Sequence, residues 1–390
     1  MSTAEALSTA LPVLPDVRVD AASLGTLTAE LARHAPAHDA DGSFPWEGIR
    51  AVHDAGLLTA SVGARYGGRG LSAAESVDVF LALGEGDPSV ALISAMTIFQ
   101  HAAQDASNAW PEDLYARVLA RSAEGPALIN AVRAEPELGA PARGGLPATT
   151  ARRTPDGWSV SGHKAFATGS EGLAYHLVWV VTDEPEPRVG HVIVPGDDPG
   201  IRIERTWDHL GLRASSTHDV VYDDVRVPFV NFSGAPVGAV PNNAALDGAF
   251  VVAVPALYVG VARAALAAYV EFVKTRVPSS LGRPLATLER IQTVAGEARA
   301  QLLQAEFVLQ AAAADIDAGR ARPDRLGAVK LLTSRSAIAA VQTLVAAIGN
   351  PGLTRSLPLE RHLRDVLCAR PHPPQDDAAL LGLGRRLLGT

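Results

Sequence analysis

The segments DGWSVSGHKAFATGSEG (residues 156–172) and DHLGLRASSTHDVVYDDVRVP (residues 208–228) decide the fold class. Both contain short runs of β-branched and aromatic residues bounded by Gly, Pro or Asp, which is typical of strands joined by turns. With the runs between them, they predict five strands, at residues 158–169, 175–183, 188–196, 201–212 and 218–228. We expect these strands to form a compact β-barrel or sandwich of about 110 residues.

The chain on both sides of these strands has helical periodicity. Leu24, Leu27 and Leu31 repeat at helical spacing, and residues 90–106 form an apolar core helix. Three later segments, residues 248–276, 288–319 and 325–349, are each long enough for a helix of a bundle. We therefore expect an α+β chain in four parts: a loose leader at 1–20, an N-terminal helical domain at 21–125, a central β domain at 126–235 and a C-terminal four-helix bundle at 236–390.

Composition excludes several classes of protein. The 390 residues include 34 Lys and Arg against 42 Asp and Glu, a net charge of −8, with no block of like charges. This balance argues against nucleic acid as a partner. The single cysteine, Cys368, can form neither an internal disulfide nor a pair of zinc ligands, so we expect a cytoplasmic protein.

Membrane and metal sites are not expected either. Four stretches without charged residues are interrupted by polar residues, prolines or a turn, and we expect the apolar ones to be buried helices: residues 88–104, 228–246, 248–262 and 336–354. His34 and His38 have the spacing of helical metal ligands, but Pro36 lies between them and no third ligand matches. The chain also lacks the GxxxxGK[ST] phosphate-binding motif.

Four phrases, in order, resemble the acyl-CoA dehydrogenase superfamily of flavoproteins: residues 44–72, 156–172, 208–228 and 348–365. The resemblance covers nearly the whole chain. It implies the same order of domains, with FAD or FMN held dry in a crevice between the β domain and the helical bundle. It also implies a homotetramer or homodimer, because the long C-terminal helices are apolar on more than one face. The alternative is a monomer in which the N-terminal domain covers those faces.

The resemblance assigns flavin contacts to KAFATGS, residues 164–170. Phe166 would lie against the flavin ring, Thr168 would place a hydroxyl near N5 or O4, and Ser170 would assist. Arg276 would reach the flavin phosphate, a role that suits a cation. The alternative is that Phe166 is ordinary strand core and Thr168 an ordinary turn residue.

Three positions depart from the dehydrogenase pattern. The catalytic Glu of many members would lie eight residues beyond Asp365, where this chain has Pro373. Asp376 and Asp377 could replace that base only in a rearranged loop. Ala134 and Ala346 stand where FAD-binding members have Thr and Gln, which weakens tight FAD binding and makes FMN or loosely held reduced flavin more plausible.

The segment LERHLRDVLCARPH, residues 359–372, resembles a second branch, the two-component flavin-dependent monooxygenases. That branch takes reduced flavin from a separate reductase and inserts one atom of O2 into a small organic substrate. Its pattern makes His372 a candidate catalytic residue, with His101 as a second, and the near-neutral pKa of histidine suits proton transfer there. The alternatives are a histidine in a solvated loop for His372 and a core histidine for His101.

Three functions follow as hypotheses. The first is a monooxygenase that uses reduced flavin and O2. The second is an FAD-dependent acyl-CoA dehydrogenase, and the third is a degenerate scaffold without catalysis. Each hypothesis involves a small-molecule substrate or a binding role, and none of them involves nucleic acid or a membrane.

Overall fold

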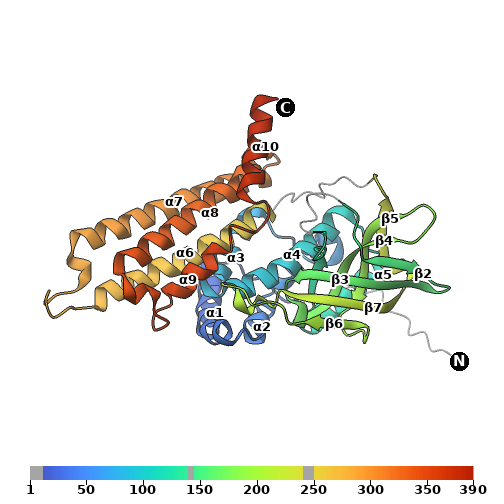
Figure 1. Cartoon of the computed structure of the whole chain (residues 1–390), viewed down its shortest axis with the longest axis horizontal. Coiled ribbons are helices and arrows are strands. Elements are labelled where there is room, and N and C mark those ends of the chain that lie inside the picture. Colours follow the sequence, from blue (N-terminus) through green and yellow to red (C-terminus); the bar gives the residue numbers. More distant parts are fainter. Residues whose placement is uncertain (1–11, 139–144, 240–249, 390) are drawn as a thin grey trace.

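The computed structural model describes residues 12–138, 145–239 and 250–389. The sheet lies at one end of the molecule, the C-terminal helices lie at the other, and two N-terminal helices, α3 and α4, lie between them (Figure 1). The N-terminal helices are α1 (Ala21–Asp41), α2 (Trp46–Asp54), α3 (Ala73–Gly86), α4 (Pro88–Ser107) and α5 (Glu112–Glu124). The expected fold class is confirmed.

Side-chain caps set the starts of three of these helices. Asp20 accepts hydrogen bonds from the backbone of Ala22 and Ser23 at the start of α1. Ser72 and Glu75 form a reciprocal capping box at the start of α3. Asp87 caps α4 from a fully buried position.

The β domain is one eight-stranded mixed sheet with the order β6-β7-β3-β2-β4-β5-β8, and β1 pairs with β4 in parallel. The strands are β1 (Leu128–Val132), β2 (Thr150–Arg153), β3 (Gly157–Ala167), β4 (Leu173–Thr182), β5 (Arg188–Pro195), β6 (Ile201–Glu204), β7 (His218–Pro228) and β8 (Phe232–Pro236). The five predicted strands correspond to β3 to β7, but the one predicted at residues 201–212 ends at Glu204, and residues 205–212 form part of the loop before β7. β1, β2 and β8 were not predicted.

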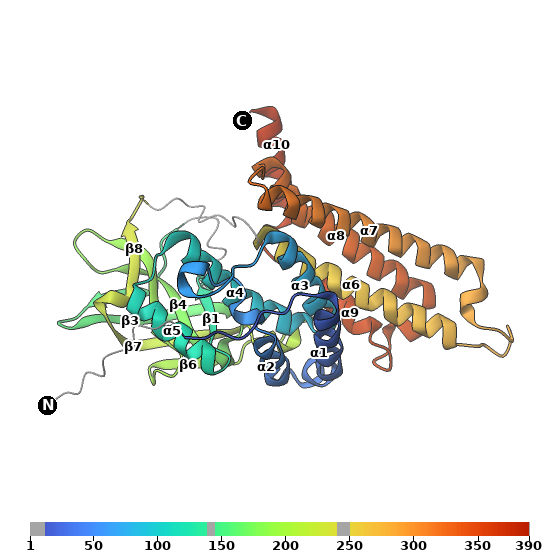
Figure 2. The same ribbon diagram turned by 180° about the vertical axis from the view of Figure 1, so that it is seen from behind.

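The C-terminal part consists of α6 (Phe250–Thr275), α7 (Glu289–Asp317), α8 (Pro323–Ile348), α9 (Leu359–Leu367) and α10 (Asp376–Leu388). α6 packs against α3, and two glycines permit the contact: a Cβ on Gly84 would lie 2.1 Å from the Leu257 carbonyl oxygen, and one on Gly260 would lie 2.3 Å from that of Leu81. Figure 2 shows α10 projecting from the rest of the bundle.

Two helices of the bundle, α6 and α8, are long and apolar enough to cross a membrane by length and composition alone. Their most apolar windows are 67% and 50% buried inside the molecule. Burial among other helices is what a core helix requires, so this pattern is weak evidence for a membrane span.

Three polar contacts tie the parts of the molecule together. Asp317, at the end of α7, accepts the backbone N–H groups of Ala73 and Ala74 at 2.7 and 3.0 Å. Arg364 of α9 forms a two-point ion pair with Asp39 of α1 at 2.9 and 2.6 Å. The neighbouring Asp365 accepts the backbone N–H of Leu212 at 2.7 Å, which fixes the loop between β6 and β7 to the bundle.

Candidate active site

The end of β3, which leads into a turn, holds an aromatic side chain in a strained conformation. Phe166 has φ of 55°, in the left-handed region that a bulky residue rarely adopts, and its side chain is 67% exposed. The backbone N–H of Ala165 donates to the Ala134 carbonyl, so position 134 lies beside this turn. An exposed aromatic ring on strained backbone is typical of a ligand contact rather than of strand core.

Thr168 follows in the same turn and is almost buried. Its hydroxyl accepts a hydrogen bond from Thr217 at 3.2 Å, and its backbone carbonyl accepts one from the Asn130 amide at 2.9 Å. Thr217 is the one polar partner of the Thr168 hydroxyl among the described residues. The Thr168 hydroxyl can therefore turn its proton toward a ring nitrogen or carbonyl of a bound ligand while Thr217 donates to it.

Ser170 supports the turn from behind. It is 2% exposed, and its hydroxyl donates to the Ser216 carbonyl at 2.8 Å. Ser216 has φ of 45°, so the supporting loop is itself held in a left-handed conformation. The burial of Ser170 favours this supporting role. Direct contact of Ser170 with flavin stays a prediction.

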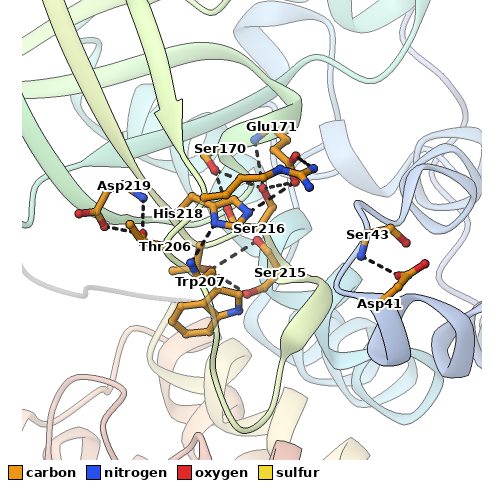
Figure 3. Close-up of polar contacts among 12 residues, drawn as sticks. Asp41, Ser43, Ser170, Glu171, Thr206, Trp207, Ser215, Ser216, His218 and Asp219 are labelled. Atoms are coloured by element: carbon orange, nitrogen blue, oxygen red, sulfur yellow. Dashed lines mark hydrogen bonds and ion pairs between the residues drawn. The ribbon is translucent and has the colours of Figure 1, made fainter.

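A polar network holds the loop before β7 against this turn (Figure 3). The Trp207 backbone N–H donates to His218 Nδ1 at 3.0 Å, and His218 Nε2 lies 3.6 Å from Glu171. Glu171 also accepts the Ser216 hydroxyl at 3.1 Å and pairs with Arg205. Burial lowers the pKa of His218, which favours the neutral ring with its proton on Nε2.

His372 lies in the segment between α9 and α10 and is fixed by a residue of α6. Its Nδ1 is 2.8 Å from the hydroxyl of Tyr258, which is fully buried. Burial and the charge of Lys330 lower the pKa of His372 to about 4, so the ring is neutral near pH 7. Burial raises the pKa of Tyr258 well above its usual value, so the phenol keeps its proton and can donate it to Nδ1.

The carboxylates that follow His372 are already engaged or point outward. Asp376 accepts from Arg335 at 3.0 Å and lies 3.9 Å from Lys330 Nζ. Asp377 is exposed in the first turn of α10. Neither residue is placed as a free base, and Pro373 offers none.

His101 is a fully buried residue of α4. Its Nδ1 is 2.9 Å from the hydroxyl of Tyr115 on α5. The ring of Tyr115 packs against the rings of Tyr66 and Trp110. Burial lowers its pKa to about 4. This is the geometry of a core histidine, and catalysis by His101 stays a prediction that the structure does not favour.

Arg276 lies apart from the other predicted site residues. It directly follows the last residue of α6, whereas Tyr258 lies in the first half of that helix. The 26-residue helix is about 39 Å long at 1.5 Å per residue. The two ends of α6 lie at opposite ends of the bundle in Figure 1. Arg276 therefore does not join Phe166 and Thr168 within one chain.

Sequence reasoning missed the residues that fix the site. Tyr258 could have been found, because it is the one side chain with a hydrogen-bonding group in the apolar run of residues 250–262. Asn130 and Thr217 carry no comparable signal, since strand pairing alone brings them to Thr168.

The arrangement fits a flavin ring. The exposed face of Phe166 can stack on the ring, and the hydroxyl proton of Thr168 can reach a ring acceptor. The β3 turn and the first half of α6 both pack on α4, since Gly169 lies against Ile93, and the Phe250 and Phe99 rings are 4.0 Å apart. α4 therefore links the turn to the helix that carries Tyr258.

Comparison with known proteins assigns the family. Three models cover most of the chain: the acyl-CoA dehydrogenase N-terminal domain at residues 24–121, the middle domain at 131–225 and the C-terminal domain at 252–374. The chain belongs to the acyl-CoA dehydrogenase family. A relative from Bacillus subtilis (strain 168), which carries the name acyl-CoA dehydrogenase YdbM, is 33% identical to this chain. The match covers 92% of this chain and 93% of the relative.

Solved structures with the same fold differ in the compounds that their names mention. KijD3 in complex with FMN and an amino-keto sugar nucleotide is 26% identical, with a TM-score of 0.80 over 97% of both chains. Butyryl-CoA dehydrogenase from Megasphaera elsdenii is 24% identical, with a TM-score of 0.82 over 96% of this chain and all of its own. The family is thus established, whereas its members differ in activity.

Proposed function

We propose that this protein is a flavin-dependent monooxygenase that uses reduced flavin and O2 on a small organic substrate. The observation that carries the proposal is the neutral His372 held by Tyr258 at 2.8 Å, in the segment where a dehydrogenase of this family would carry its carboxylate base. A neutral imidazole with Nδ1 occupied keeps its proton on Nε2, where it can be donated to an oxygen atom.

Flavin, when bound, supplies the redox chemistry, and the chain supplies its position. Phe166 would stack on the ring and Thr168 would donate to its rim. Ala134 offers no hydroxyl where FAD-binding members carry Thr, which favours FMN or a loosely held reduced flavin, as in the FMN complex of KijD3. We propose a cytoplasmic enzyme that receives its reduced flavin from a separate reductase.

Assembly into a homotetramer or homodimer belongs to the same proposal. Large apolar side chains are exposed on the outer helices of the bundle, among them Phe307 of α7, Leu332 of α8 and Leu381 of α10. A second copy could cover them. Arg276 would serve as a flavin-phosphate ligand only if such a copy brings it to the site.

The alternative function is an acyl-CoA dehydrogenase, which the YdbM similarity favours. It needs a base for the substrate α-proton. The ion pair of Asp376 with Arg335 would first have to break. The third hypothesis, a scaffold without catalysis, remains as the outcome in which no flavin binds.

One experiment separates these functions. The protein is loaded with oxidised FAD and mixed anaerobically with butyryl-CoA, and in parallel it is loaded with reduced FMN and mixed with O2. We expect no bleaching of the oxidised flavin by butyryl-CoA and a return of oxidised FMN slower than that of free FMN. Bleaching by the thioester would establish the dehydrogenase, and failure to bind either flavin would establish the scaffold.

A further inference from the structure

A second candidate site lies on a different part of the bundle. An open cleft of about 960 Å³ is lined by α1, α6, the loop between β6 and β7, and residues 355–364 at the start of α9, with Glu85 of α3 at one side. These four helices gather together in both views of the chain (Figures 1 and 2). Small side chains form its floor, including Ala29 and Ala32 of α1 and Ala264 and Ala268 of α6. None of Phe166, Thr168 and His372 lines it, so the cleft is separate from the flavin site.

Arg361 of α9 lines this cleft with an unpaired guanidinium group. The residue is 8% exposed, and its Nε and Nη1 atoms are fully buried without a hydrogen-bond partner. Two buried carboxylates, Asp87 and Asp365, lie close enough for their charges to interact with Arg361, but each accepts its hydrogen bonds from backbone N–H groups and none from the guanidinium. A buried cation without an acceptor is rare in folded proteins and points to a ligand.

Among the described residues, the carboxylates that line the cleft form no ion pair with Arg361. Arg364 donates four hydrogen bonds to the carboxylates of Asp39 and Glu360 and a fifth to the Leu210 carbonyl. Arg355 lies exposed at the rim. Glu85, the remaining carboxylate, is half-buried, and burial raises its pKa, which reduces its negative charge.

We propose that this cleft binds a small amphiphilic organic anion. Its carboxylate or phosphate group accepts hydrogen bonds from Arg361, since a guanidinium group matches both head groups. Its apolar body lies on the alanine floor between α1 and α6. The volume is that of a typical small-molecule site. The proposal is independent of flavin binding and of the reaction at His372.

The test uses the fluorescent anion 8-anilinonaphthalene-1-sulfonate, titrated into the full-length protein with and without excess FMN. The variants are Arg361→Met and, as a matched control, Arg385→Met, which removes an arginine of α10 outside the cleft. We expect Arg361→Met to weaken binding at least tenfold and Arg385→Met to leave it unchanged. The neutral analogue N-phenyl-1-naphthylamine should bind both variants equally.

Two further measurements keep the test decisive. Ala268→Trp fills the floor of the cleft and leaves Arg361 in place, so it should also abolish binding of the dye, even if Arg361→Met folds poorly. Displacement of the dye by octanoate or by octyl phosphate identifies the head group. Equal dye affinity in wild type and Arg361→Met, retained binding in Ala268→Trp, or displacement by neither anion would overturn the proposal.

Discussion

At the scale of single residues, the site depends on side chains in conformations that the local sequence does not favour. Phe166 and Ser216 both have positive φ, and each lies in a segment that borders Thr168. Left-handed backbone costs a non-glycine residue about 1 kcal/mol or more. Strain of that size is typical of functional sites, and under the proposed function the ring of Phe166 stacks on flavin.

Phe166→Gly separates this task from stability. Glycine adopts positive φ without strain, so we expect the free energy of unfolding without flavin to stay equal or rise by about 1 kcal/mol. Loss of the aromatic face should weaken FMN binding at least tenfold in a fluorescence titration. Phe166→Leu keeps the strain and the bulk, and it should also lose affinity. Unchanged affinity in both variants would make Phe166 an ordinary turn residue.

The buried ion pair beside the same turn offers a second prediction. Lys164 is fully buried, and its Nζ lies 2.7 Å from Glu135, which also accepts the Thr149 hydroxyl and two backbone N–H groups. Lys164→Met leaves a buried carboxylate without its counter-charge, which should cost about 3 kcal/mol in urea unfolding. The double variant with Glu135→Gln should recover part of this loss, and no recovery would show that the effect is one of packing.

At the scale of elements, helix ends connect parts of the chain that are far apart in sequence. The start of α3 is capped twice, locally by Ser72 and Glu75 and from α7 by Asp317. The local cap can be predicted from sequence because its residues lie within one turn. The cap from α7 cannot, since it depends on how two helices 200 residues apart in sequence pack, as the contact of Asp317 with Ala73 shows.

Asp317→Ala tests the connection between α7 and α3. Loss of two backbone hydrogen bonds at a helix start should lower the free energy of unfolding by about 1 kcal/mol. Ser72→Ala should cost a similar amount, and the double variant should lose the sum of the two, because Ser72 accepts the N–H of Glu75 whereas Asp317 accepts those of Ala73 and Ala74. Thermal unfolding of the four proteins measures these losses, and a loss in the double variant well above or below the sum would contradict independent caps.

The same reasoning explains how much of the fold and site could be predicted. Long periodic segments such as residues 288–319 and strand runs such as residues 218–228 carry their own signal, and they are α7 and β7. The short β1 and β2 carry none, because tertiary pairing rather than local pattern makes them strands. For the site, the family resemblance pointed to Phe166, Thr168 and His372, whereas Tyr258 reaches His372 only through the packing of α6.

At the scale of the whole molecule, burial keeps at least five histidines of the described residues neutral near pH 7. Burial lowers the pKa of His101, His176 and His372 to about 4, and that of His191 and His362 to about 3. The unfolded chain binds a proton at each of them near pH 6.5 and the folded chain does not. Their contribution to stability is therefore complete above pH 6.5 and is lost as the pH falls toward 4.

Acid unfolding tests this prediction. We expect the free energy of unfolding to fall between pH 6.5 and 4 by on the order of 2 kcal/mol for each such histidine. His191→Phe retains an aromatic ring against Trp179, whose ring centre is 4.7 Å from that of His191, and should fall less steeply than wild type. His34→Phe, at the surface of α1, should follow the wild-type curve. Parallel curves for all three proteins would contradict the account.

The most direct test of the central claim is the reaction of the FMNH2-loaded protein with O2 in wild type and in His372→Ala, with His34→Ala as control. The return of oxidised flavin absorbance and the release of hydrogen peroxide are followed together in a stopped-flow instrument. If His372 controls this reaction, His372→Ala should return oxidised flavin at least tenfold faster, with peroxide release, and Tyr258→Phe should lie between it and wild type. Identical traces for wild type and His372→Ala would contradict a role for His372 in oxygen chemistry.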